Sequence, residues 1–360
     1  MNQNILRNLL SIYRHAQYAI CRRYRHGVMP PGKLCSVEAH EYDINHGDIV
    51  HPCVRYVPEG YLGHKWWLIY TPYYKSDASL ENPILCVGES NTEEFPKSWK
   101  FYCDVCKGHV KGYNSDPNLL YDKGRLYVFW RENQTNNCVD YDVSRATFAG
   151  IVEERNIRKI ATPILIARDE HLDNEVSPAF IRFKDNLHAY ATSVQFFSPK
   201  IRKLPRALKK IINPSLLILD LLGLYRLRKS FGIARWLGSD PQSSFNLSEI
   251  KIPRGKNALY QPWHIDVFEY EDVLYAVIQS NQCNADIILA KSDDGENFTI
   301  FKKPLITITD INKTGIYKPS AIVVNGQFIL LYTAQDYENR SLNKLYFTSC
   351  NFKELLSRLR

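Results

Sequence analysis

Five positions along the chain carry polar or charged side chains at the start of an apolar segment, where they could take part in chemistry. They are His51, Asp116, Ser177, His264 and Lys318. An imidazole or a carboxylate can exchange a proton with a substrate or a water molecule near neutral pH. Two histidines and a carboxylate can instead bind a divalent metal, although hydrogen bonding of His264 and Asp266 to a sugar is the favoured interpretation.

Residues beside the fourth and fifth of these positions are suited to binding a substrate. Trp263 directly precedes His264, and Tyr317 directly precedes Lys318. A lysine at the bottom of a pocket favours an anionic group in the substrate, such as a uronate or a phosphate. A solvated lysine at the start of a strand is the alternative.

Other candidates lie near the first and second positions. Glu81 follows a group of aromatic side chains between residues 66 and 74, which either stack on sugar rings or fill the core. Arg131 and Glu132 are candidates for the rim of a pocket or for a surface ion pair.

One pattern of sequence surrounds all five positions. A proline (Ile265 in the fourth copy) is followed by an apolar strand, a polar turn and a second apolar strand, at intervals of 65, 61, 87 and 54 residues. The second strands are expected at residues 66–71, 126–130, 187–192, 274–279 and 328–333, and third strands at 83–90, 232–239 and 287–292. Such spacing predicts an all-β, five-bladed propeller with four strands per blade. An irregular β-sandwich is the alternative, and a strand within residues 37–44 is expected to close the ring.

The composition agrees with one large folded unit. Hydrophobic residues make up 45% of the 360 residues and charged residues 23%, so a substantial core is available. No run of about 18 apolar residues indicates a transmembrane helix. The nine cysteines lack regular spacing and indicate reduced thiols in a cytosolic protein; Cys103 and Cys106 are interpreted as packing residues rather than a zinc site.

Two segments carry the basic excess of a chain whose net charge is +8. Residues 1–26 hold five arginines and no acid, and residues 199–229 hold nine basic residues and one acid. We therefore divide the chain into residues 1–36, a basic amphipathic helix and linker, and residues 37–360, the propeller. The propeller contains a helical, basic and apolar insertion at about 198–230, in the third blade.

Both basic segments also carry apolar side chains, as helices at a membrane surface do. We expect the insertion to contact an anionic membrane through six residues, which are Arg202, Lys203, Lys209, Lys210, Leu217 and Leu221. The predicted location is cytoplasmic, on the inner face of the membrane, with the protein a monomer. A capping helix or a protein-docking hairpin is the alternative. Nucleic acid is not expected as a partner, because the segments lack aromatics interleaved with basic residues.

Asp116-Pro117 opens one blade and Glu175-x-Ser-Pro opens the next. In this the chain resembles the five-bladed arabinanase, xylosidase and levansucrase-like glycoside hydrolases, especially divergent family-43-like members encoded near bacterial surface-polysaccharide genes. The resemblance implies a central pocket with a general base on the first blade, an aspartate on the second that tunes the acid's pKa, and a glutamate on the third as general acid. Asp116 and Glu175 match the second and third.

The first-blade position departs from this pattern, because it is His51 and not a carboxylate. Either His51 or a displaced carboxylate such as Asp48 or Glu81 is then the base, or hydrolysis is altered or lost. Inverting hydrolysis needs two carboxyl groups about 6.5–9.5 Å apart.

The resemblance leads us to expect an inverting glycoside hydrolase-like enzyme. Its substrate would be a bacterial surface glycan or the lipid-linked precursor of one, and no cofactor is expected. The alternative is a non-catalytic glycan-binding or scaffold propeller in polysaccharide biosynthesis.

Overall fold

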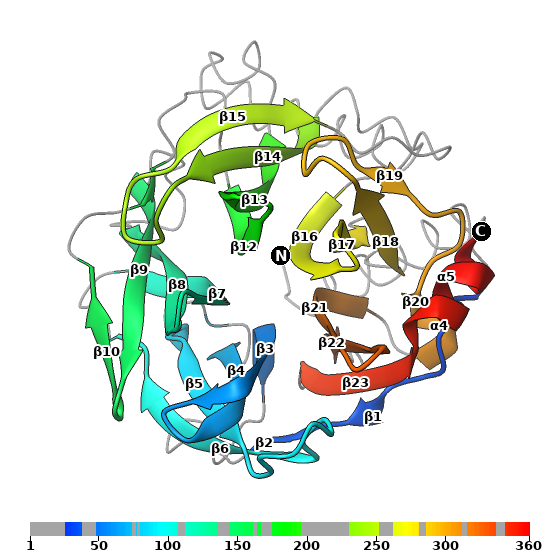
Figure 1. Ribbon diagram of the computed structural model, residues 1–360, viewed down its shortest axis with the longest axis horizontal. Coiled ribbons are helices and arrows are strands. Elements are labelled where there is room, and N and C mark those ends of the chain that lie inside the picture. Colours follow the sequence, from blue (N-terminus) through cyan, green and yellow to red (C-terminus); the bar gives the residue numbers. More distant parts are fainter. Residues whose placement is uncertain are drawn as a thin grey trace, which may run out of the picture.

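Five β-sheets surround a central axis like the blades of a propeller (Figure 1). The computed structural model describes residues 26–37, 48–73, 77, 80–106, 112–134, 144–160, 164–166, 175–195, 230–251, 262–280, 286–311, 315–335 and 343–360. The innermost strands of the blades are β3, β7, β12, β16 and β21. The predicted all-β, five-bladed propeller is therefore confirmed.

Each blade runs outward from the axis in antiparallel order. The first blade contains β3 (Ile49–Tyr61), β4 (His64–Pro72), β5 (Ile84–Gly88) and β6 (Ser98–Asp104). The second contains β7 (Tyr113–Asp122), β8 (Arg125–Gln134), β9 (Ser144–Glu153) and β10 (Asn156–Lys159), with β11 (Leu165–Ile166) also pairing with β9. The third contains β12 (Glu175–Phe183), β13 (Asn186–Gln195), β14 (Ser230–Gly238) and β15 (Asn246–Lys251).

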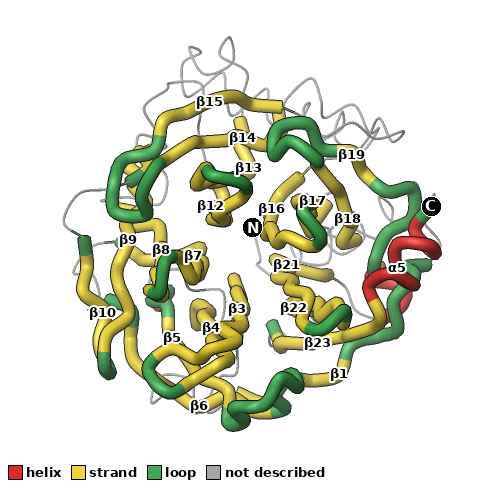
Figure 2. The backbone as a smooth tube through the Cα atoms, in the orientation of Figure 1, coloured by secondary structure: helices red, strands yellow, loops and turns green. Residues whose placement is uncertain are grey.

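The last two blades follow the same plan. The fourth contains β16 (Pro262–Tyr270), β17 (Val273–Ser280), β18 (Asp286–Ser292) and β19 (Thr299–Ile300), with β20 (Ile306–Thr307) pairing with β18. The fifth contains β21 (Gly315–Val324), β22 (Gln327–Gln335) and β23 (Lys344–Asn351). Short helices α4 (Ile308–Ile311) and α5 (Phe352–Leu359) lie at the rim (Figure 2). All the predicted second and third strands are present.

The polar turns predicted between the first two strands of each blade account for the hairpins. In the second blade Lys123 and Gly124 have φ angles of 48° and 75°, and in the fifth Asn325 and Gly326 have 49° and 75°. Two successive positive φ angles are typical of the type I′ turn, whose twist matches that of the flanking strands. Local sequence thus sets the register of these inner hairpins.

The ring is closed by a segment near the N-terminus. β1 (Lys33–Leu34) is the fourth strand of the fifth blade, and β2 (Ser36–Val37) pairs in parallel with β6 of the first blade. Met29 is buried among core residues of the fourth and fifth blades. β1 therefore precedes the predicted range of 37–44, β2 meets it at Val37, and residues 38–44 lie outside the described residues. Residues 26–36, which the sequence assigned to a separate N-terminal segment, pack as part of the propeller.

Large apolar side chains fill the spaces between neighbouring blades. Trp67 of the first blade and Trp130 of the second are fully buried in one shared cluster, and Phe129 stacks on Phe180 of the third blade with ring centroids 3.8 Å apart. These contacts between blades fix the inner strands around the axis.

The predicted N-terminal helix and the helical insertion at 198–230 lie outside the described residues, apart from Ser230, which begins β14. The same holds for the six predicted membrane contacts (Arg202, Lys203, Lys209, Lys210, Leu217 and Leu221). Among the helices that the structure describes, none is long and apolar enough to span a membrane.

Candidate functional site

A β-bulge interrupts the innermost strand of every blade at the same place. The register shifts lie at Val50/Cys53, Ser115/Asn118, Val176/Ala179, Pro262/His264 and Tyr317/Ser320. A bulge redirects a side chain relative to the regular alternation of a strand. In four blades the bulge begins at the blade-opening residue that the sequence singled out, and in the fourth it falls at Trp263, directly before His264.

Three of these positions also have an unusual backbone conformation. His51, Asp116 and Ser177 have φ angles of 53°, 51° and 53°, and each precedes a proline. A left-handed conformation at a residue other than glycine costs about 1–3 kcal/mol and persists only where the surroundings enforce it. The repetition of this strain in three adjacent blades marks the axis as a functional site.

Asp116 lies at the centre of this group and contacts side chains from several blades. Its Oδ2 is 2.5 Å from Nη2 of Arg131 and accepts a hydrogen bond of 3.1 Å from Ser115. Its Oδ1 accepts a 2.5 Å hydrogen bond from Ser177 and lies 3.4 Å from Nε2 of His51. Burial alone would raise the pKa of Asp116, but the nearby basic groups, with Arg131 the strongest, hold it well below its usual range. Asp116 is therefore a permanently charged carboxylate.

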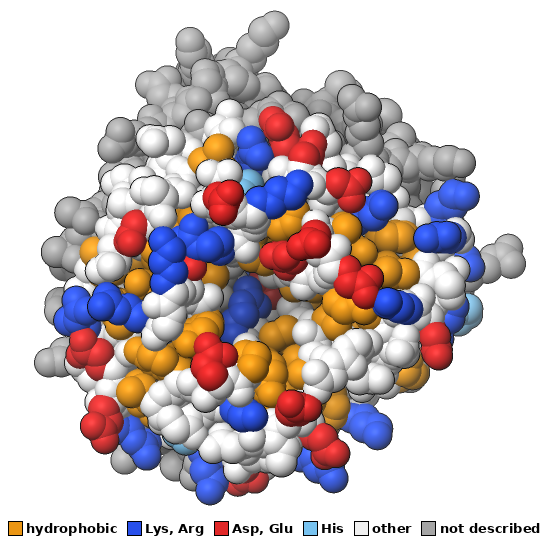
Figure 3. Space-filling view, viewed as in Figure 1, with side chains coloured by type: hydrophobic (Ala, Val, Ile, Leu, Met, Phe, Trp, Pro, Cys, Tyr) orange, Lys and Arg blue, Asp and Glu red, His pale blue; other side chains and the backbone are white. Residues whose placement is uncertain are grey.

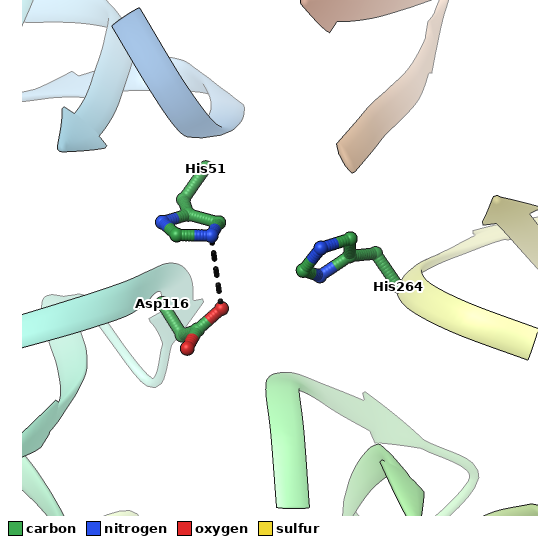
Figure 4. A group of neighbouring side chains, drawn as sticks. All are labelled: His51, Asp116 and His264. Carbon is green, nitrogen blue, oxygen red and sulfur yellow. Dashed lines mark ion pairs between the residues drawn. The ribbon is translucent and has the colours of Figure 1, made fainter. Parts of the chain in front are cut away.

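The two histidines face Asp116 from the first and fourth blades (Figure 4). Burial lowers the pKa of His51 to about 4 and that of His264 well below its usual value, so both imidazoles are neutral at pH 7. Nδ1 of His264 contacts the hydroxyl of Ser177. Nδ1 of His51 and Nε2 of His264 have no hydrogen-bond partner within the described parts of the chain. His51, Asp116 and His264 each offer one ligand atom, all within 4.8 Å of one another.

Tyr317 and Trp263, which the sequence offers as substrate-binding candidates, lie beside the histidines. The Tyr317 hydroxyl is 3.3 Å from Nε2 of His51, and its ring meets that of His264 edge-on at 4.4 Å between centroids. The Trp263 ring is edge-on to His264 at 6.0 Å. Aromatic faces and hydroxyls of this kind are common in sugar-binding pockets.

Glu81 is buried near Asp116 and Arg131 and is 7% exposed. Its burial, followed by the negative charge of Asp116, raises the pKa of this carboxyl well above its usual value. Its Oε2 has no hydrogen-bond partner among the residues described. A carboxyl that stays protonated donates a proton and does not accept one, so the site gives Glu81 the character of an acid and not of the base considered from the sequence.

Lys318 does not meet the expectation that it faces an anionic substrate. Its side chain is fully buried, and Nζ donates a 3.0 Å hydrogen bond to the carbonyl oxygen of Pro117. Burial lowers the pKa of its ammonium group. The lysine instead fixes the backbone beside Asp116, because Nζ is hydrogen-bonded to the carbonyl of Pro117, the residue that follows Asp116.

Asp266 likewise departs from the predicted sugar-binding role. Its carboxylate is fully buried and receives two hydrogen bonds from Arg55, of 2.9 and 3.2 Å. It also accepts from Ser320 Oγ at 2.6 Å and from the backbone nitrogen of Ala321 at 3.2 Å. Residues of the propeller itself therefore supply the hydrogen-bond donors of this carboxylate.

The remaining carboxylate candidates are placed differently. Glu175 is the first residue of β12, where its backbone pairs with Ser193, and its side chain lies outside the described set. Asp48 accepts a 2.6 Å hydrogen bond from the backbone nitrogen of Asn343, so it joins the first blade to the fifth. The base role considered for Asp48 is therefore not supported by its contacts.

Arg131 and Ser115 complete the site, and sequence reasoning identified neither as a partner of Asp116. Arg131 is buried in the ion pair and is not a rim residue, whereas Glu132 contacts Lys159 at 2.5 Å. Arg131 pairs with Ser115 across the hairpin. Counting the register back from the turn at Lys123 would have placed the arginine next to Asp116.

A space-filling view shows one face of the propeller hollowed at its centre, with hydrophobic side chains around the hollow and a basic one at its bottom (Figure 3). The innermost strands thus leave an opening on the axis, where a propeller commonly binds its ligand.

Comparison with known proteins identifies the fold. No protein-family model matches the sequence, and no curated protein matches it either. Among solved structures, the chain is similar to an N-acetylgalactosamine deacetylase from F. plautii in complex with blood group B trisaccharide. The TM-score is 0.59 at 15% identity, covering 92% of this chain and 97% of that one.

Two further structures share the architecture. One is Zg3597, a family 117 glycoside hydrolase of Zobellia galactanivorans (TM-score 0.57, 11% identity, 91% and 92% of the two chains). The other is the Penicillium chrysogenum α-L-arabinanase complexed with arabinobiose (TM-score 0.53, 13% identity, 88% and 80%). The fold is the five-bladed propeller of these proteins. At such low identity the similarity establishes the fold, and the residues of this chain must carry any statement about its chemistry.

Proposed function

We propose that the protein is a glycoside hydrolase-like enzyme that binds and cleaves a carbohydrate at the propeller axis. The observation that carries the proposal is the pairing of two buried carboxyl groups, Asp116 and Glu81, in opposite electrostatic surroundings within one strained site. Hydrolysis of a glycosidic bond needs one group that donates a proton and another that stays charged. The solved propellers of this fold that hold an oligosaccharide support a carbohydrate as the ligand.

The roles follow from the surroundings of each group. Asp116 stabilises positive charge that develops on the sugar ring, because Arg131 keeps it ionised without neutralising Oδ1. Glu81 or Glu175 protonates the leaving oxygen. His51 is neutral and can accept a proton from water, although its pKa of about 4 makes it a weak base.

For the substrate we propose a bacterial surface glycan or its lipid-linked precursor, on the basis of the family resemblance of the blade-opening residues. A cytoplasmic protein attached to the inner membrane face through residues 200–229 would meet such a precursor. Flotation with liposomes containing anionic lipid should be lost when residues 200–229 are deleted from a protein that still folds. Equal flotation of the deletion variant would refute this role for the segment.

Turnover of a panel of chromogenic glycosides and capsule oligosaccharides tests the proposed reaction. Glu175→Gln and Glu81→Gln are compared with wild type and with Glu94→Gln, an exposed control. The variant that removes the general acid should lose turnover by about 100-fold or more and keep its binding affinity. Unchanged turnover in both Glu175→Gln and Glu81→Gln would contradict acid catalysis by these residues.

A non-catalytic glycan-binding propeller is the second candidate, and His51 is the observation that favours it. The first-blade position carries an imidazole in contact with Asp116 and not a carboxylate base. Binding of oligosaccharides without any product, at every pH tested, would establish this alternative.

A further inference from the structure

We propose that His51, Asp116 and His264 form a binding site for a divalent transition-metal ion, of the zinc or manganese class, on the propeller axis. The three side chains come from the first, second and fourth blades and offer ligand atoms within 4.8 Å of one another (Figure 4). Imidazole and carboxylate ligands together favour such ions, whereas Ca²⁺ prefers sites built from six to eight oxygen ligands.

The protonation state of His264 leaves one of its ring nitrogens free. The Ser177 hydroxyl donates its only proton to Oδ1 of Asp116, so its contact with His264 Nδ1 requires Nδ1 to carry a proton. Nε2 of His264 then has a bare lone pair. That atom is fully buried, and no described residue donates to it. A buried acceptor without a donor is unfavourable unless something else, such as a cation, occupies its lone pair.

His51 lies beside His264, with ring centroids 5.5 Å apart, and presents its Nε2 to Asp116. Its Nε2 lies 3.4 Å from Asp116 Oδ1 and 3.3 Å from the Tyr317 hydroxyl, while Nδ1 meets no hydrogen-bond partner in the described ranges. The side chain is 7% exposed. In His51 the nitrogen available to a cation beside Asp116 is therefore Nε2, and the Tyr317 hydroxyl is the contact that such a cation would replace.

The surroundings of Asp116 already orient it as a ligand. Arg131 and Ser115 hold Oδ2, whereas Oδ1 accepts from Ser177 and lies 3.4 Å from Nε2 of His51. Hydrogen bonds to the second oxygen of a carboxylate fix its orientation in many metal sites. The nearby ammonium group of Lys318 is engaged with the Pro117 carbonyl.

A bound cation would supply Lewis-acid chemistry, polarising a substrate oxygen or lowering the pKa of a water molecule. This catalytic role rests on the proposed hydrolytic function, whereas binding of the metal does not. Hydrolysis that persists in a chelator would leave the proposed function intact without the metal, and metal binding without hydrolysis would leave the metal site intact without the function.

Equilibrium dialysis with elemental analysis tests the site directly. Untagged protein is stripped with a chelator and dialysed against Zn²⁺, Mn²⁺ or Ca²⁺. Wild type should bind about one equivalent more Zn²⁺ or Mn²⁺ than His51→Leu or His264→Leu. His188→Leu, which replaces a buried histidine of the third blade that is hydrogen-bonded to Tyr190, should retain that equivalent.

Equal metal content in wild type and in the His51 and His264 variants would overturn the proposal, as would binding of Ca²⁺ alone. Thermal unfolding gives a second measurement that does not depend on the leucine variants. Zn²⁺ or Mn²⁺ should raise the unfolding temperature of wild type and of His188→Leu but not of Asp116→Asn. The absence of a rise in wild type, or the same rise in Asp116→Asn, would refute the site.

Discussion

Two buried aspartates near the axis differ in whether all the buried polar atoms around them have hydrogen-bond partners. Asp116 and Asp266 both lie on innermost strands, both pair with an arginine, and both have lowered pKa values. The Asp266 group is complete: no side-chain atom of Asp266 or of its partners Arg55, Asn118 and Ser320 is among the described buried atoms without a hydrogen bond.

The Asp116 group is incomplete, although it lies in the same interior. It includes such atoms on His51, His264 and Glu81, together with the positive φ angles of His51 and Asp116. Buried polar networks that are fully satisfied stabilise a fold, whereas strain and unmet polar atoms gather where a ligand binds. The comparison therefore assigns stability to the Asp266 group and chemistry to the Asp116 group.

The largest effect is expected when Asp266 is removed. Asp266→Ala leaves the guanidinium of Arg55 buried without its partner, which should lower the free energy of unfolding by about 3–5 kcal/mol. Urea unfolding measures the loss. Glu153→Ala, which breaks the exposed pair with Arg158, is the control and should cost less than about 1 kcal/mol. A loss for Asp266→Ala no greater than that of the control would show that the network is not structural.

A smaller effect on stability is expected when a side chain that carries an unpartnered polar atom is removed from the Asp116 site. His264→Leu deletes the unpartnered Nε2 and also the hydrogen bond between Nδ1 and Ser177, whose hydroxyl still donates to Asp116. The free energy of unfolding of metal-free protein should therefore change by no more than about 1 kcal/mol. The same urea measurement applies. Destabilisation as severe as that of Asp266→Ala would mean that His264 serves the fold and not a ligand.

The smallest effect concerns the pH dependence of stability. The pKa of Glu81 is raised in the folded protein above its usual 4.5. Above pH 4.5 the folded state therefore holds a proton that the unfolded chain has released, and stability falls as pH rises through the folded-state pKa. Glu81→Gln removes this cost, so its gain in stability over wild type should be near zero at about pH 4 and positive at about pH 7.

Unfolding free energies of the two proteins at both pH values check this prediction. Burial also raises the pKa of Asp286, to about 7, so Asp286 likewise makes the free energy of unfolding fall as pH rises. Since Asp286 is present in both proteins, its contribution cancels in the difference. An equal difference at both pH values would indicate that Glu81 is not protonated in the folded state.

The repeated pattern predicted the blades well because each hairpin is encoded locally, by a proline, alternating apolar residues and a turn such as Asn325-Gly326. The same alignment placed His51, Asp116 and His264 at corresponding positions, and in the structure their ligand atoms lie within 4.8 Å of one another. The partners of Lys318 and Asp266 could not be found in this way. They come from other blades, and spacing along the chain carries no information on contacts across the axis.

Closure of the ring shows a second limit of prediction from sequence. The strands that join the first and fifth blades, β1 and β2, are only two residues long, too short for a periodic pattern. Their place is decided by pairing with β23 and β6 and by burial of Met29, which are tertiary contacts. The sequence therefore predicted closure by an N-terminal strand, but the strand that completes the fifth blade, β1, lies at Lys33–Leu34, before the predicted range.

The most direct test of the division between the two aspartates is a crystal structure with anomalous scattering data from protein loaded with Zn²⁺ or Mn²⁺. We predict one strong peak on the axis, about 2.0–2.2 Å from an atom of each of His51, Asp116 and His264. No peak is expected near Asp266. An axis without a metal peak at saturating ion, or a peak bound by Asp266, would contradict the assignment of chemistry to the Asp116 group.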